Sequence, residues 1–187
     1  MAKRVQKPFP ALYPIPVVLV TCLDEDNEPN VLTVAWIGTV SSTPPQIAIS
    51  VRPYRYSHAL IRETGEFVVN IPTEDLLHAV DYCGRISKST RDKFADTGLT
   101  PEPASQVRVP IIGECPVNIE CKVVESVSLG SHDLFVGEIV AVHVDEELLD
   151  EEGFIDYVKA KAVAYLGNEY WSLGERLESS GFTMRGS

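Results

Sequence analysis

Residues 49–61, with the sequence ISVRPYRYSHALI, join an apolar strand to the start of a helix. The run 47–51 is apolar and β-branched, which is typical of a buried strand. The proline that follows Arg52 disfavours helical dihedral angles there, and Ser57 stands where an N-cap residue would begin a helix. The segment therefore predicts a strand, a tight turn and a helix N-terminus, with Arg52 and Arg55 beside it.

Two arginines at one turn are notable in a chain with 16 basic and 27 acidic residues and a formal net charge of −11. The backbone N–H groups and the dipole of a helix start favour a negative charge, and guanidinium groups strengthen that preference. The turn therefore predicts a phosphate site, and the sequence leaves open whether Arg52 or Arg55 meets the phosphate. The alternative is that both arginines are solvated loop residues that balance local acidic groups.

The chain has 187 residues, of which 44% are hydrophobic, and this is enough for one sizeable core. We expect a single domain over residues 1–180. Residues 181–187 form a tail whose last four residues, MRGS, resemble a vector-derived remnant. The acidic composition argues against nucleic-acid binding. No apolar run approaches the ~18 residues that span a membrane, and no signal peptide is recognisable, so a cytoplasmic protein is expected.

No metal site or catalytic side chain is expected from the sequence. The cysteines and histidines are dispersed along the chain: Cys22, Cys83, Cys115, Cys121, His58, His78, His132 and His143. Such spacing predicts buried thiols and gives little support to a metal-binding structural protein. The chain also lacks a Walker sequence, a GxGxxG motif after the first strand and a GxSxG elbow. A bound cofactor would therefore have to supply the chemistry.

The pattern of apolar residues predicts a mainly β fold with a few short helices. Strands are expected at 17–23, 31–38, 47–51, 66–72, 117–127 and 134–144, with the first two joined as a hairpin. Short helices are expected from Ser57 to near Gly65, after a cap at Thr73, and at 92–95 before Gly98. Many antiparallel strands with few helices indicate a barrel, because closure removes the sheet edges.

Several fragments occur in a characteristic order. They are NVLTVAWIG from Asn30, PPQIAISVRP from Pro44, YSH from Tyr56, GEFVVNIP from Gly65, CG at Cys83 and DKF at Asp92. In this order and spacing they resemble the flavin reductase-like FMN-binding split barrels, in particular the flavoredoxins. The resemblance runs from about residue 13 to about residue 171. It implies a six-stranded antiparallel Greek-key split barrel, noncovalent FMN and a homodimer.

Carried across by position, the resemblance also implies a set of cofactor-binding residues. They are Asn30, Thr33, Trp36, Ser50, Arg52, Arg55, Ser57, Lys93, His132 and Tyr165. Without the resemblance, Trp36 and Tyr165 would be interpreted as packing aromatics. Lys93 would be a surface charge and His132 a solvated turn residue. As an N-cap, Ser57 is expected to stabilise the flavin-free protein, whereas Lys93 is expected to contribute only to phosphate binding.

A flavin itself accepts a hydride or single electrons, so no side chain has to act as a general acid. The resemblance implies an oxidoreductase that moves electrons from NAD(P)H or a protein donor to free flavin, ferric iron or a redox partner. An FMN-binding electron carrier or sensing module without its own turnover is the alternative. The chain has no dinucleotide fingerprint, so the sequence does not identify the donor.

Overall fold

The computed structural model describes residues 1–87 and 90–184, which form a mainly β fold with three α-helices. The strands are β1 (Ile15–Pro16), β2 (Val18–Leu23), β3 (Pro29–Val34), β4 (Ile37–Ser42), β5 (Pro45–Val51), β6 (Glu66–Ile71), β7 (Pro101–Glu102), β8 (Ile111–Ile112), β9 (Val117–Ser128), β10 (Asp133–Val144), β11 (Val163–Leu166) and β12 (Glu169–Ser172). The α-helices are α1 (Tyr56–Thr64), α2 (Leu77–Arg85) and α3 (Lys93–Thr97), and short 3-10 helices occur at η1 (Glu74–Leu76), η2 (Glu146–Leu148) and η3 (Phe182–Met184).

The main sheet has seven strands in the order β3-β2-β6-β9-β10-β5-β4, and every neighbouring pair is antiparallel. It curls on itself, because Leu32 and Val34 of β3 share one core cluster with Ile47 and Ile49 of β5. Helix α1 contributes to the same cluster. The predicted split-barrel class is therefore confirmed, with seven strands in the main sheet in place of six.

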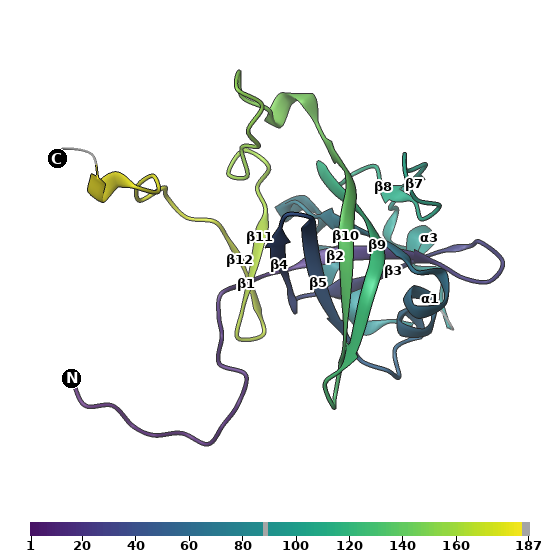
Figure 1. The fold of residues 1–187 in the computed structure, drawn as a ribbon, viewed down its shortest axis with the longest axis horizontal. Helices are drawn as coiled ribbons and strands as arrows, with labels where there is room; N and C mark the ends of the chain where they lie inside the picture. The colour runs from purple at the N-terminus through teal and green to yellow at the C-terminus, as the bar shows by residue number, and fades with distance from the viewer. Residues whose placement is uncertain (88–89, 185–187) are drawn as a thin grey trace.

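The hairpin of β9 and β10 runs across the barrel as its longest element (Figure 1). Its register shifts between Val136 and Gly137 and again between Ile139 and Ala141. Such bulges bend a strand and increase its twist, which a closing sheet needs. A Cβ atom on Gly137 would lie 2.6 Å from Cζ of Phe67. The backbone at Gly137 therefore lies so close to the ring of Phe67 that a larger residue would clash with it.

Strand β2 is buried along its whole length, as the continuous apolar run predicts. One face packs into the barrel core, and the other packs beneath α2 and α3 against residues such as Val80 and Phe94. All four cysteines are buried thiols outside any disulfide, as predicted. None of the helices in the described ranges has the length and apolar character to cross a membrane.

Two predicted helix ends are confirmed. Gly65 ends α1 with φ of 67°, and Gly98 ends α3 with φ of 73°. Both angles lie in the left-handed region that favours glycine. Thr73 occupies the N-cap position of η1, but its side chain makes no capping hydrogen bond.

The predicted N-cap at Ser57 is wrong. Helix α1 begins at Tyr56 with Arg55 as its N-cap, and no side chain caps it. The N–H of Arg55 donates to the carbonyl of Arg52 (3.0 Å), so the turn feeds directly into the helix. Ser57 lies in the first turn, and its Oγ accepts a hydrogen bond from Nδ2 of Asn30 (2.7 Å). The Ser57 hydroxyl is therefore hydrogen-bonded to Asn30, 27 residues away in the sequence, and does not cap the helix.

The single strand predicted over 31–38 is also wrong. The chain leaves β3 after Val34 and starts β4 at Ile37, where it pairs with β5. Between them, the carbonyl of Trp36 accepts a hydrogen bond from the N–H of Ser50 (2.9 Å). This break places the side chain of Trp36 at the junction between the two ends of the sheet.

A small sheet of β1, β11 and β12 lies outside the barrel. The segment before β1 has no regular secondary structure, and both terminal segments leave the barrel on the same side of the view (Figure 1). Phe182–Met184 form a 3-10 turn. The last three residues of the suspected remnant, 185–187, lie outside the described residues.

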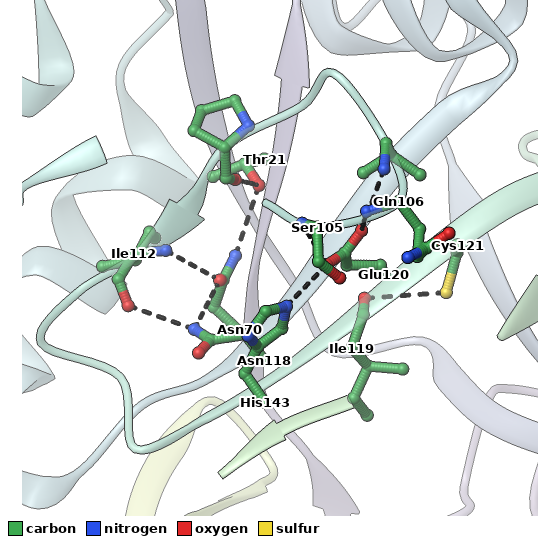
Figure 2. Close-up of polar contacts among 12 residues, drawn as sticks. Thr21, Asn70, Ser105, Gln106, Ile112, Asn118, Ile119, Glu120, Cys121 and His143 are labelled. Carbon is green, nitrogen blue, oxygen red and sulfur yellow. Dashed lines mark hydrogen bonds and ion pairs between the residues drawn. The ribbon is translucent and has the colours of Figure 1, made fainter. Parts of the chain in front are cut away.

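A buried carboxylate anchors the loop between β7 and β8 (Figure 2). Glu120 of β9 is fully buried and accepts hydrogen bonds from the N–H groups of Ser105, Gln106 and Val107 and from Oγ of Ser105 (2.7 to 2.9 Å). His143 pairs with it through Nε2 at 2.5 Å. Burial opposes ionisation, but the hydrogen bonds from His143 and Ser105 outweigh it and lower the pKa of Glu120 to about 2.

Asn70, on the adjacent strand β6, is the centre of a second group of buried hydrogen bonds (Figure 2). Its Oδ1 accepts from the N–H of Ile112 and from Nδ2 of Asn118, and its Nδ2 donates to the carbonyl of Leu19. We name the set Glu120, Ser105, His143, Asn70, Asn118 and Thr21 the loop-anchor cluster. Every buried polar side-chain atom of this cluster has a partner, so it stabilises the fold and offers nothing to a ligand.

Candidate functional site

A narrow pocket opens beside the first turn of α1, and we name it the inner pocket. Its volume is about 30 Å³, and its walls include Thr33, Arg55, Ser57, Gly84 and Lys93. Strand β3, helix α1 and the end of α2 therefore meet there. A Cβ atom on Gly84 would lie 3.3 Å from Cβ of Thr33, so the end of α2 lies close against β3.

Ser57 lines the inner pocket, and Asn30 lies behind it. Because Oγ of Ser57 accepts from Asn30, its own hydrogen is free to donate toward a ligand. Oδ1 of Asn30 is the only buried side-chain nitrogen or oxygen atom in residues 1–87 and 90–184 without a hydrogen-bond partner. An unpaired buried acceptor is costly, and its position behind the pocket indicates a site that a polar ligand completes.

Lys93 supplies a buried positive charge to the same pocket. The residue is 5% exposed, and its Nζ donates to the carbonyls of Val31 (2.6 Å) and Cys83 (3.3 Å). Neither partner carries a negative charge, and one N–H of the ammonium stays available. Burial, and to a smaller extent the charge of Arg55, lower the pKa of Lys93. The interpretation of Lys93 as a surface charge is therefore wrong.

Arg55 borders the inner pocket and a much larger cavity, which we name the outer chamber. Nη2 of Arg55 donates to the carbonyl of Gly84 (2.9 Å) and fixes the guanidinium between the two spaces. The outer chamber has a volume of about 730 Å³ and shares Thr33, Arg55 and Gly84 with the inner pocket. Arg52 lines only the outer chamber.

Two aromatic rings meet at the rim of the outer chamber. The ring centroids of Trp36 and His132 are 4.4 Å apart at 36°, although the residues belong to distant segments. Trp36 is 42% exposed, so it is not a core residue. Nδ1 of His132 pairs with Oγ of Ser131 (2.9 Å). Burial and the charge of Arg52 lower the pKa of His132, which favours the neutral imidazole.

Three tyrosines, Tyr13, Tyr165 and Tyr170, also line the outer chamber. Tyr165 lies between Tyr13 and Tyr170, with centroid distances of 6.5 and 5.4 Å. The hydroxyl of Tyr170 donates to Oδ1 of Asp81 (3.1 Å), which ties the small sheet to α2. Arg85 also binds this carboxylate. Sequence reasoning missed this group of residues. No local signal marks the contact between Asp81 and Tyr170, which spans 89 residues, whereas Asp81 and Arg85 form an i,i+4 pair on α2.

The structure brings the ten predicted site residues together. Nine of them line the inner pocket or the outer chamber: Thr33, Trp36, Ser50, Arg52, Arg55, Ser57, Lys93, His132 and Tyr165. The tenth, Asn30, contacts Ser57 from behind. Their role in holding a cofactor stays a prediction.

A curled antiparallel sheet with a narrow cationic pocket that opens into an aromatic chamber defines a split-barrel protein with one composite ligand site. The model of the flavin reductase like domain family matches residues 11–173. The chain belongs to this family.

Relatives agree with this assignment over most of the chain. An uncharacterized protein of Archaeoglobus fulgidus is 36% identical over 89% of this chain and 93% of its own length. The structure of flavoredoxin of Desulfovibrio vulgaris (Miyazaki F) is 36% identical, with a TM-score of 0.92 over 98% of this chain and 100% of that chain. An FMN-binding protein from Thermus thermophilus is 27% identical, with a TM-score of 0.80 over 96% of this chain and 99% of that chain.

Proposed function

We propose that the protein is an FMN-binding flavoprotein oxidoreductase. The observation that carries this proposal is the inner pocket, where Lys93, Arg55 and Ser57 converge beside the unpaired Oδ1 of Asn30. Two cations and a free hydroxyl donor suit a phosphate monoester, because charged donors to a phosphate make short and strong hydrogen bonds. A phosphate at the end of a flavin side chain fits this arrangement, and the similarity to an FMN-binding protein supports it.

Each residue has a separate part in this assignment. Lys93 and Arg55 neutralise the phosphate, and Ser57 donates its hydroxyl hydrogen to it. Asn30 holds Ser57 in place and presents an acceptor that a ligand hydroxyl would satisfy. Thr33 cannot serve as a donor without giving up its present bond, because its hydroxyl already donates to the carbonyl of Val80. It therefore shapes the passage between the two spaces.

The outer chamber would accommodate the isoalloxazine ring. When bound, FMN supplies hydride and single-electron transfer. Trp36 and Tyr165 both line the ring space, and the exposure of Trp36 leaves the chamber open to a second molecule. His132 presents its Nε2 for a hydrogen bond at the rim, because its Nδ1 pairs with Ser131. The proposed donor is NAD(P)H or a redox protein, and the proposed acceptors are free flavin, ferric iron or another redox protein.

The test compares FMN with riboflavin, which lacks only the phosphate. The purified protein is expected to bind FMN with quenched flavin fluorescence and to prefer it by at least about tenfold, because each charge-assisted bond is worth about 1.5–3 kcal/mol. Equal affinity for both flavins would refute the assignment of the inner pocket as a phosphate site. Oxidation of NADH or NADPH by the FMN-loaded protein then tests the enzyme. Tight FMN binding without oxidation by either nucleotide favours the electron carrier or sensing module.

We also propose a homodimer. An apolar groove of about 450 Å³ adjoins the outer chamber and is lined by Leu12, Tyr13, Ile15, Trp36 and Ile37. Leu12 is 82% exposed, which is costly for a leucine beside other apolar groups. A second copy would cover this groove with an interface above about 1,000 Å². Light scattering is expected to give twice the chain mass of 20.6 kDa, and a 20.6 kDa particle at micromolar concentration would rule the dimer out.

A further inference from the structure

Arg52 is a cation without an assigned anion. Its side chain is exposed, its guanidinium lies 5.9 Å from the ring centroid of Tyr54, and within the described ranges it belongs to none of the ion pairs. In a chain with a net charge of −11, an arginine that faces a cavity without an acidic partner stands out. The acidic group that lines the same chamber, Asp81, is already held by Arg85 and Tyr170. It therefore does not neutralise Arg52.

The two arginines of the turn serve different spaces. Arg55 is fixed by the carbonyl of Gly84 and borders the inner pocket, whereas Arg52 lines the outer chamber alone. The charge of Arg52 acts on His132, so the guanidinium lies near the rim formed by His132 and Trp36. One phosphate in the inner pocket would consequently leave the exposed Arg52 without a charged partner.

The rim also offers a flat surface beside this charge. The rings of Trp36 and His132 are in contact at a tilt of 36°, and the exposed ring of Trp36 offers a face on which a planar ligand can pack. The chamber volume of about 730 Å³ lies in the upper part of the range of about 300–1,000 Å³ that ligand pockets cover. It leaves room for a second planar group beside one ring system.

We propose that Arg52 and the Trp36–His132 pair form a second anion subsite that selects a planar aromatic ligand with one negative charge, such as an aromatic carboxylate. The carboxylate meets the guanidinium of Arg52, and the ring lies against Trp36 and His132. This inference rests on the proposed function, because it assigns the flavin phosphate to the inner pocket. It narrows the class of small molecule that the site admits next to the flavin.

The experiment uses calorimetric titration of the full-length protein, saturated with FMN, with 2-naphthoate and with the uncharged 2-naphthamide. The wild-type protein is expected to bind the naphthoate at least about tenfold more tightly, as one charge-assisted pair requires. Arg52→Gln is expected to abolish this preference. Arg108→Gln removes the same charge from an exposed residue that pairs with Glu66, and it is expected to keep the preference.

Several results would overturn the subsite. They are equal binding of the two probes by the wild-type protein, a preference that survives Arg52→Gln, and release of FMN by the naphthoate, which would place the probe in the inner pocket. FMN occupancy is measured separately after gel filtration. If the protein binds no FMN, the proposed function fails. In that case, the naphthoate and naphthamide titrations are repeated with the flavin-free wild-type protein and the variants Arg52→Gln and Arg108→Gln. The same preference, and its loss in Arg52→Gln alone, is then required for the anion subsite.

Discussion

The loop-anchor cluster and the inner pocket both contain buried polar groups, but they differ in whether those groups have hydrogen-bond partners within the chain. In the loop-anchor cluster, Glu120 and Asn70 meet a donor or acceptor at every buried polar atom. In the inner pocket, Oδ1 of Asn30 lacks a partner, and Lys93 is charged without an anion. The first cluster is complete within the chain. The second is complete only with a ligand, and this difference separates polar groups that hold the fold from those that bind.

The largest expected effect is on the complete cluster. Glu120→Gln removes a buried charge and turns an amide toward N–H donors, so the free energy of unfolding is expected to fall by about 3–5 kcal/mol. The preference for FMN over riboflavin is expected to stay unchanged. Urea denaturation and flavin titration measure the two quantities. Glu125→Gln on the exposed face of the same strand is the control, and equal stability of both variants would show that Glu120 is not an anchor.

Acid is expected to act on the same cluster. The folded-state pKa of Glu120 is about 2, below its ordinary value of 4.5. A lowered pKa contributes stability above the ordinary value, and this contribution is lost as the pH falls from about 4.5 to about 2. The melting temperature of the wild-type protein is therefore expected to drop across this window more than that of Glu120→Gln. Parallel melting curves for both proteins would contradict this assignment.

Lys93→Met is expected to affect both ligand and fold. It removes the phosphate cation, so the preference for FMN over riboflavin is expected to fall by at least about tenfold. It also leaves the carbonyls of Val31 and Cys83 without their buried donor, and the free energy of unfolding is expected to fall by about 1–3 kcal/mol. Lys122→Met, on an exposed position of β9, is the control. This stability loss replaces the earlier expectation that Lys93 contributes only to phosphate binding.

Ser57→Ala is expected to give the smallest change. It removes one hydroxyl donor and leaves Nδ2 of Asn30 with only the weak acceptor Sγ of Cys22 (3.5 Å). The free energy of unfolding is expected to fall by about 1 kcal/mol, and the FMN preference is expected to fall less than in Lys93→Met. Ser126→Ala on β9 is the control. If Ser57→Ala and Lys93→Met both keep the parent preference, the phosphate lies elsewhere.

Local signals predicted the elements that depend on local chemistry. The sequence predicted the glycines that end α1 and α3, and it predicted strands β9 and β10 from alternating apolar residues. Each of these features depends on residues that are close together in the sequence. The site was predictable only through the order of fragments along the chain. The resemblance based on that order assigned all ten residues to one site, whereas Lys93 taken alone would have been interpreted as a surface charge.

What sequence reasoning missed depends on distant partners. Ser57 has the properties of an N-cap, but Asn30 binds it from another strand. Trp36 sits within an apolar run, but β4 leaves β3 there to pair with β5. Glu120 is polar at a position of β9 that proves fully buried, and only the folded loop explains it. In each case the decisive contact joins segments that no local pattern connects.

The burial of Lys93 also has a consequence for proton exchange. Its lowered pKa means that part of the population gives up a proton at alkaline pH. A phosphate held beside the ammonium would raise that pKa again, so binding would draw a proton from solution. The flavin affinity would then decline as the pH rises, and the heat of binding would vary with the buffer. One ammonium below the surface thus links cofactor loading to the alkalinity of the surroundings.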